Sequence, residues 1–393
     1  MPPPRGAGSY NATMALPPEV CIRGAGIVGR TLALLLARER VRVALVVPET
    51  RSTAQDVRAY ALNAASKQLL ESLRAWPDIA YATPVREMLI YGDEGGRVQF
   101  SAARQKVEAL AWIVDVPALE RQLGDAVRFQ PRIEVVSAPV AAPLTVICEG
   151  RLSATRETLG VGHEVTRYPQ HAIAARLEAE RPHDGTARQW FNDKGEVLAL
   201  LPLADANRPA DAHALDRSLA LVWSVEQHRA PELLAQSAEV FCAGLRDAMH
   251  DALGALKLTS ERAAWPLQRA IAERWTGRFD NGAAWALAGD AAHSVHPLAG
   301  QGLNLGLGDA AALAEIIKSR DYWRSVGDPR LLRRYERTRR TGVLSMSLAT
   351  DGLQQLFAHS ADPLPALRNW GMRGFDRTRL VKNWIARQAM GLQ

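Results

Sequence analysis

The chain has 393 residues, of which 47% are hydrophobic and 23% charged, and its formal net charge is +6 at pH 7. These values are typical of a globular protein with a large core, and no apolar run reaches the roughly 18 residues that suggest a membrane span. The basic residues are interleaved with acidic ones and no nucleic-acid-binding motif is present, so the sequence argues against a nucleic-acid partner.

The first residues and the cysteines bear on the cellular compartment. Residues 1–17 are rich in proline and lack the apolar segment of a secretory signal, so we expect a disordered tail. Cys21, Cys148 and Cys242 lie far apart without metal-ligand spacing, which favours buried, reduced thiols. These features predict a cytoplasmic protein, and no metal site is expected.

A glycine-rich turn between two apolar segments follows the tail. Residues 20–22 are predicted to form a short buried strand, a helix with a leucine-rich face follows and ends at Arg40, and residues 41–47 form a second buried strand. The turn has the GxGxxG pattern, with glycines at 24, 26 and 29. A GxGxxG turn framed by strand, helix and strand is a strong signal for dinucleotide binding.

Each position in this turn has its own physical reason. Gly24 permits the tight turn, Gly26 lets a pyrophosphate approach the backbone, and Gly29 lets the helix pack closely on the strand. The first helical residues, Ile27 and Val28, offer free N–H groups and the positive end of the helix dipole to the phosphates. We therefore expect all five residues to bind the cofactor.

One contact of the dinucleotide pattern departs from expectation. An acidic residue usually ends the second strand and binds a ribose hydroxyl. Val47 occupies that place here, and Glu49 follows two residues later. Either Glu49 makes the ribose contact from its later position or the contact is missing.

A second glycine-rich segment, "WALAGDAAHSVHPLAGQGLNLGLGDA", covers residues 285–310. Its first residues predict a strand that ends at Gly289 and Asp290, where the carboxylate can accept hydrogen bonds from sugar hydroxyls. A helical apolar pattern follows, and the N–H groups at its start are free donors that suit the negative edge of a reduced flavin ring. The candidates at this helix start are Gly300, Gly302, Leu303 and Asn304.

These motifs resemble those of the class A FAD-dependent aromatic monooxygenases, and the second resembles one branch in particular, the ubiquinone-biosynthesis hydroxylase family. The segment "DVRAYALNAASKQLLESLRAW" at 56–76 is similar to the arginine-containing segment of that family. The resemblance implies that Arg58 lies near the flavin and that Pro297 lies near its reactive edge. It extends over residues 18–393.

The resemblance implies an α/β (α+β) fold. A Rossmann-like FAD-binding domain is expected to be interleaved with a mixed β-sheet substrate domain and followed by a helical C-terminus. In the substrate domain, "RQWFND" and "KGEVLALLPL" predict a hairpin connected near residues 192–195. The expected segments are 18–82, 109–160 and 263–345 for the FAD-binding domain, 83–108 and 161–262 for the substrate-binding domain, and 346–393 for the C-terminal helical region.

The implied reaction is hydroxylation of the aromatic ring of a polyprenylated ubiquinone precursor. FAD carries the chemistry: the reduced flavin reacts with O₂ to give a C4a-hydroperoxide, with electrons from NAD(P)H or a separate reductase. His296 and Pro297 are the candidate catalytic residues. The neutral imidazole of His296 can deprotonate a phenol or orient the peroxide, and the resemblance places Pro297 near the reactive edge of the flavin. The alternative is that His293 and His296 only brace the loop. Trp190 likewise either packs in the core or contacts the substrate.

A polyprenyl tail prefers the bilayer, because each buried methylene contributes about 0.8 kcal/mol. The sequence therefore predicts a peripheral location on the inner face of the membrane or membership of a ubiquinone-biosynthesis complex. Residues 379–391 predict a basic amphipathic helix that either docks on such a surface or packs against the core. The basic helix at 330–340 is either a solvated face or a contact for an anionic surface.

Two departures from the family pattern leave alternative functions open. In "VICEGRLSATR", Glu149-Gly150 stands where the family commonly has Asp-Gly. Together with Val47, this substitution favours a scaffold subunit that binds FAD weakly. A further alternative is a flavoprotein monooxygenase or reductase that acts on another apolar substrate.

Overall fold

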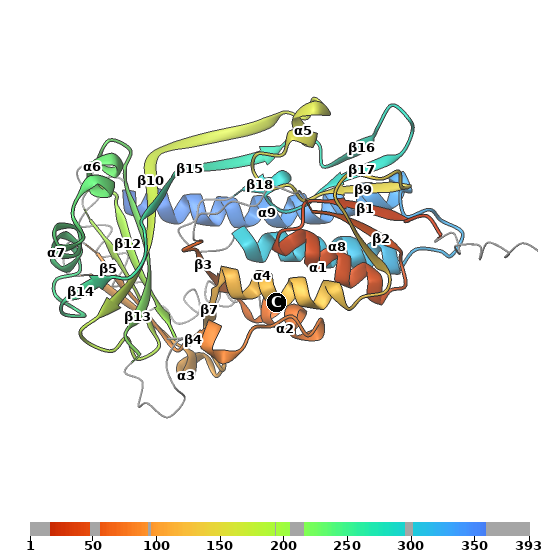
Figure 1. Ribbon diagram of the computed structural model, residues 1–393. Coiled ribbons are helices and arrows are strands. Elements are labelled where there is room, and N and C mark those ends of the chain that lie inside the picture. The colour runs from red at the N-terminus through yellow and green to blue at the C-terminus, as the bar shows by residue number, and fades with distance from the viewer. Residues whose placement is uncertain are drawn as a thin grey trace, which may run out of the picture.

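The computed structural model describes residues 16–47, 56–92, 96–192, 194–204, 216–294 and 302–358, with side chains as far as residue 344. Figure 1 shows two lobes: a sheet with its helices on the right and a larger sheet on the left, joined along the top by the long strands β10 (His163–Ala179) and β15 (Ala263–Ala272). This arrangement confirms the predicted α/β fold. The predictions at Glu49, His296, Pro297, Gly300 and 379–391 lie outside the described residues.

The right-hand lobe is built on a six-stranded sheet of order β16-β17-β9-β1-β2-β8. Every neighbouring pair except β16–β17 is parallel. The four central strands are short apolar segments with almost every residue buried, as is typical of strands in a parallel sheet. In sheet order the strands span Thr276–Arg278, Ala284–Leu287, Leu144–Ile147, Val20–Arg23, Val43–Val46 and Ile133–Val136.

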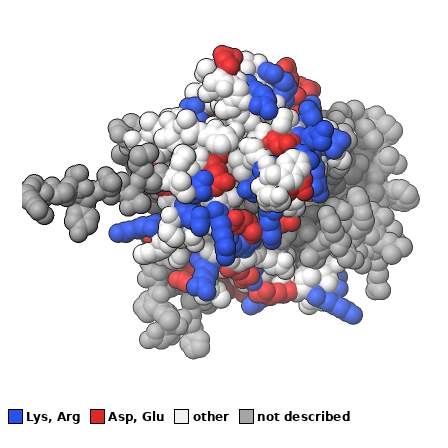
Figure 2. Space-filling view, turned by 90° about the vertical axis from the view of Figure 1, so that its right-hand side faces the viewer, with Lys and Arg blue, Asp and Glu red and all other residues white. Residues whose placement is uncertain are grey.

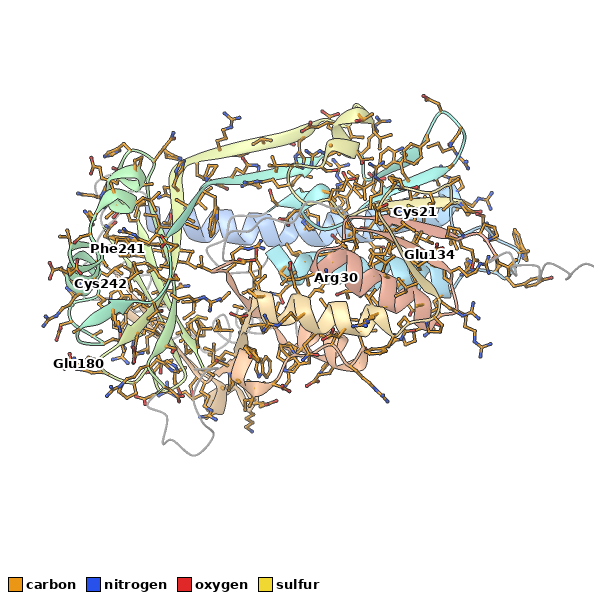
Figure 3. The ribbon with its side chains drawn as sticks, viewed as in Figure 1. Cys21, Arg30, Glu134, Glu180, Phe241 and Cys242 are labelled. Atoms are coloured by element: carbon orange, nitrogen blue, oxygen red, sulfur yellow. The ribbon has the colours of Figure 1, made fainter. Side chains whose placement is uncertain are left out.

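Four helices pack around this sheet. Helix α1 (Ile27–Arg38) connects β1 to β2 and completes the predicted βαβ unit. It packs against α4 (Val116–Arg128), where Arg30 of α1 donates from Nη1 to the carbonyl oxygen of Glu120 at 2.7 Å (Figure 3). It also packs against α8 (Gly302–Lys318), which in turn packs against α9 (Pro329–Ala358).

The left-hand lobe is built on a nine-stranded sheet, in which β14 (Leu256–Leu258) pairs with β10 beside the main order β18-β15-β10-β13-β12-β11-β5-β6. Strands β11 and β12 are antiparallel, which confirms the predicted hairpin. Strand β15 pairs with β10 in the larger sheet, whereas its residues were expected to belong to the FAD-binding domain. The domain boundaries themselves remain a prediction. The other strands span His293–Ser294 (β18), Ser218–Glu226 (β13), Val197–Leu203 (β12), Thr186–Phe191 (β11), Glu87–Tyr91 (β5) and Arg97–Ser101 (β6).

The outer face of the larger sheet is covered by α6 (Arg229–Ala235) and α7 (Ala238–Ala248), with Phe241 of α7 buried in the core between them and the sheet (Figure 3). Trp190 of β11 belongs to this core and stacks on Tyr91 with ring centroids 5.2 Å apart. This confirms the core-packing interpretation of Trp190. Because side chains alternate along a strand, Gln189 and Phe191 lie on the opposite, inner face.

A three-stranded antiparallel sheet packs against the inner face of the larger sheet. Its strands are β3 (Ala59–Leu62), β7 (Ala111–Asp115) and β4 (Ala82–Val85). Val85 and Ile113 pack against residues of the larger sheet such as Ala220, so this interface is apolar. The remaining short helices are α2 (Ala64–Ser72), α3 (Ala102–Gln105), α5 (Ala154–Thr158), η1 (Ile79–Tyr81) and η2 (Gly289–Ala291).

The surface agrees with the composition. Figure 2 shows basic side chains interspersed with acidic ones on the face at the right of Figure 1. In the basic helix, Leu332 and Tyr335 are buried while Arg333 and Arg337 are exposed, as expected of a solvated helix face. The three cysteines are buried free thiols, as predicted. No helix in the described part of the chain has the length and apolar character to cross a bilayer.

Candidate functional site

The turn between β1 and α1 has a geometry that only glycine permits at two positions. Gly24 has φ +106°, and a Cβ atom there would lie 2.4 Å from the carbonyl oxygen of Cys148, the residue that follows the neighbouring strand β9. A Cβ atom at Gly29 would lie 1.9 Å from the carbonyl oxygen of Gly24. The tight turn and the close packing predicted for these two glycines are therefore both observed.

Gly26 differs from its neighbours because a Cβ atom there would meet no atom within 4 Å. It is the N-cap of α1, no side chain caps that helix, and its first turn holds no acidic residue. The first N–H groups of α1 therefore have no side-chain acceptor and adjoin open space. This combination fits a phosphate group, which would supply the missing acceptors and the negative charge.

The second glycine-rich bend lies directly against the first. Strand β17 leads into η2, where Gly289 has φ +62°. A Cβ atom at Gly289 would lie 3.2 Å from Cγ2 of Val28, and one at Gly306 of α8 would lie 2.8 Å from the same atom. Val28 in the first turn of α1 therefore packs on both the turn and the helix of the second bend. Two motifs far apart in the sequence form one structural unit.

A buried ionic network holds the second bend in place. The side chain of Asp309 in α8 is fully buried, and its Oδ2 accepts from the backbone N–H of Gly289 at 2.9 Å and from Nε2 of His293 at 2.6 Å. Its Oδ1 accepts from Nε of Arg339 at 2.7 Å, which links α9 to the same carboxylate. Burial alone would raise the pKa of Asp309, but His293 and Arg339 hold it below its usual value.

This network answers the question about His293. Its ring donates to Asp309 and stacks on Trp275 with ring centroids 5.0 Å apart, so the predicted bracing role is confirmed for His293. The sequence reasoning did not predict Asp309 or Arg339. Asp309 could have been found from its position on an apolar face of the predicted helix, because a charge that is buried there requires a partner.

The charge of Arg58 acts on Asp290 of the second bend. Arg58 precedes β3 and is held by Asp56 through two hydrogen bonds, Nε–Oδ1 at 2.8 Å and Nη2–Oδ2 at 2.6 Å. Asp290 in η2 is exposed, but the surrounding protein displaces enough water to raise its pKa, and the charges of His293, Arg151 and Arg58 lower it in part. The arginine of one segment and the aspartate of the other are thus close enough to interact electrostatically.

Comparison with known proteins places the chain. A profile of the FAD-binding domain family matches residues 119–346. The ubiquinone hydroxylase UbiL of Rhodospirillum rubrum is 31% identical over 417 aligned positions, which cover 99% of this chain and 93% of the relative. The 3-demethoxyubiquinol 3-hydroxylase of Escherichia coli is 28% identical, covering 96% of this chain and 99% of the relative.

The chain belongs to the FAD-dependent monooxygenase family that contains the ubiquinone hydroxylases. Solved structures agree in fold. PqsL, a probable FAD-dependent monooxygenase from Pseudomonas aeruginosa, has a TM-score of 0.72 at 22% identity and covers 91% of this chain and 99% of its own. The p-nitrophenol 4-monooxygenase PnpA from Pseudomonas putida has a TM-score of 0.73 at 17% identity, with 96% and 98% covered.

In this flavoprotein, Asn304 joins the start of α8 to the small sheet. Its Oδ1 accepts from the N–H of Asn63 at 3.0 Å and from Oγ of Ser66 at 2.7 Å, and its Nδ2 donates to the carbonyl oxygen of Ala61 at 2.8 Å. These bonds occupy the side chain of Asn304. A contact with FAD through the backbone of Gly302, Leu303 and Asn304 remains a prediction.

Glu149, the departure from the family pattern, is engaged within the flavoprotein itself. Its carboxylate accepts from Oγ of Ser153 at 2.8 Å and from both the N–H and Oγ1 of Thr155, at 3.1 and 2.6 Å. It also forms an ion pair with Nε of Arg23 at 3.0 Å. Burial opposes ionisation, but these donors lower the pKa of Glu149 overall. The extra methylene thus brings the carboxylate onto the start of α5.

His163 provides a pH prediction. It begins β10, and burial, with the charges of Arg156 and His293, lowers the pKa of His163 from its ordinary value of 6.5 to about 4. The unfolded chain therefore binds a proton before the folded one, and stability should fall as the pH drops from about 6.5 to 4. The free energy of unfolding is measured in urea titrations at pH 7 and at pH 4.5. We expect its decrease between these two pH values to be smaller in His163→Gln than in wild type, by on the order of 2 kcal/mol.

His228, which is largely exposed, is the control for this prediction. His228→Gln should follow the wild-type dependence on pH. Equal losses for His163→Gln and wild type would show that the acid sensitivity originates elsewhere.

Proposed function

We propose that this flavoprotein uses O₂ to hydroxylate the aromatic ring of a polyprenylated ubiquinone precursor. The observation that carries the proposal is the similarity to ubiquinone hydroxylases over nearly the whole chain, in a protein whose two glycine-rich bends pack on one another. When bound, FAD supplies the activation of O₂, for which protein side chains have no equivalent.

The residues described above fit the parts of FAD. The uncapped start of α1 at Gly26 would bind the pyrophosphate, and the exposed carboxylate of Asp290 would accept hydrogen bonds from hydroxyl groups of the ribityl chain. The start of α8 at Gly302 and Leu303 would place N–H donors at the polar edge of the ring, where they stabilise negative charge. Asp309 acts indirectly, because it positions the backbone of Gly289 rather than contacting FAD.

The inner face of the larger sheet would bind the substrate. Alternation along β11, β12 and β13 places Phe191, Ala199 and Val222 on this face, opposite the core that contains Trp190. Apolar side chains suit a hydrophobic aromatic ring and exclude water from it. His296 and Pro297 remain the predicted catalytic residues on sequence grounds.

The proposal includes a peripheral membrane location and electrons from NAD(P)H or a separate reductase. A polyprenylated substrate resides in the bilayer, so the enzyme must meet the membrane or a lipid-carrying partner to reach it. The amphipathic pattern at 379–391 supports this part of the proposal, as does the family's link to ubiquinone biosynthesis.

A scaffold subunit with weak FAD affinity is the second candidate function. The observation that favours it is the engagement of Glu149 by Ser153, Thr155 and Arg23, which leaves this carboxylate fewer free acceptor sites for a cofactor contact. The exposed Asp290 and the open space at Gly26 favour the enzyme.

The test uses the purified full-length protein and a lipid extract from cells in which its gene is deleted. With FAD, a reductant and isotopically labelled O₂, we expect one labelled oxygen atom to appear in the quinone precursor that accumulates in the deletion strain. A colourless protein that takes up no added FAD would favour the scaffold. An FAD-loaded protein that leaves every precursor unlabelled would point to a different apolar substrate.

A further inference from the structure

We propose that Tyr60 contacts bound FAD, with its ring lining the cofactor site between Arg58 and Asp290. This inference rests on the placement of FAD proposed above and adds a residue that the sequence motifs did not indicate. Tyr60 lies in β3, two positions after Arg58, and neither glycine-rich bend contains it.

The direction of the Tyr60 side chain follows from the pairing of β3. Ala59 and Ala61 pack into the apolar interface with the larger sheet. Tyr60 alternates with them, and it packs from the other side against the core that contains α1 and α8. Its ring is only partly buried there, so part of it stays accessible.

The polar surroundings of the Tyr60 hydroxyl locate it within the site. Tyr60 follows Arg58 by two positions, so alternation places the two side chains on the same side of the strand, and the charges of Arg58 and Asp290 both act on the phenol. Burial raises the pKa of Tyr60, so the hydroxyl is protonated near neutral pH and can itself donate. Tyr60 is therefore near both charged residues that we place beside the cofactor.

The end of β3 is fixed relative to α8, which keeps Tyr60 in this position. Asn304 in the first turn of α8 accepts from the N–H of Asn63 and donates to the carbonyl oxygen of Ala61. The carbonyl oxygen of Arg58 also accepts from Nη2 of Arg176 at 2.8 Å. Hydrogen bonds on either side of Tyr60 thus hold the strand, and an aromatic ring on such a rigid support suits contact with a flat cofactor.

Fluorescence of bound FAD tests this inference, because a tyrosine in contact with a flavin quenches its emission by electron transfer and a phenylalanine does not. Apoprotein is titrated with FAD and the emission of the bound flavin is measured for Tyr60→Phe, Tyr60→Trp and wild type. We expect bound-FAD emission to rise several-fold in Tyr60→Phe and to stay quenched in Tyr60→Trp. Loss of the hydroxyl should also weaken FAD binding by about 2- to 10-fold.

Tyr322 provides the matched control, because its side chain is 99% exposed on the connection between α8 and α9. Tyr322→Phe should leave both emission and affinity unchanged, and circular dichroism checks that each variant is folded. Unchanged emission and affinity in a folded Tyr60→Phe would overturn the inference while leaving the FAD site intact. Failure of the wild-type protein to bind FAD would instead refute the proposed function.

Discussion

Replacing Asp309 with Asn should lower the free energy of unfolding by about 3–5 kcal/mol, the loss typical of breaking a buried ion pair from one side. The substitution preserves size but removes the negative charge of the carboxylate that binds both Arg339 and His293. It also introduces an NH₂ group, which can only donate, into a site where the N–H of Gly289 already donates. Urea unfolding followed by tryptophan fluorescence measures the effect. FAD retention should fall as well, because Gly289 loses its anchor.

The control for Asp309 is Asp125, which lies exposed on α4. Asp125→Asn should change stability by no more than about 0.5 kcal/mol. Because the pKa of Asp309 is held below 3.8, its contribution is present above that pH and disappears as the pH falls further. A loss below about 1 kcal/mol in Asp309→Asn near neutral pH would mean that the network does not support the second bend.

Replacing Gly26 with Ala should weaken FAD binding at least about tenfold while the protein stays folded. The open space at Gly26 accepts a Cβ atom in the free protein, but the methyl group would occupy the space that we assign to the pyrophosphate. Gly29→Ala should behave differently, because its Cβ atom would collide with the carbonyl oxygen of Gly24 and disrupt the turn itself. Apoprotein titration and thermal unfolding separate the two effects.

Gly244 in α7 is the matched control for Gly26, since a Cβ atom there also meets nothing within 4 Å. Gly244→Ala should bind FAD as wild type does and gain about 0.5–1 kcal/mol of stability from its helical position. Normal FAD affinity in a folded Gly26→Ala would contradict the assigned pyrophosphate position.

The first glycine motif could be predicted from the sequence because each glycine has a local cause. Gly24 has a left-handed φ, Gly29 meets the carbonyl oxygen of Gly24, and Gly26 faces open space; all three depend on a few neighbouring residues. The β11–β12 hairpin was predictable for the same reason, since alternation and a short connection specify it.

The polar network could not be predicted, because its partners meet only after packing. Asp309 reaches His293 and Gly289 when α8 lies beneath η2, and it reaches Arg339 when α9 packs on α8. The role of Tyr60 similarly depends on which face of β3 turns toward the FAD side. No spacing in the sequence encodes these distances.

Equilibrium titration of the apoprotein with FAD tests most directly whether the two bends build one cofactor site. We expect one FAD per chain, and we expect a change at either bend, Gly26→Ala in the first or Gly302→Val in the second, to weaken that same binding event. The contradicting result is a wild-type protein that binds no FAD, or a folded variant at either bend that retains full affinity.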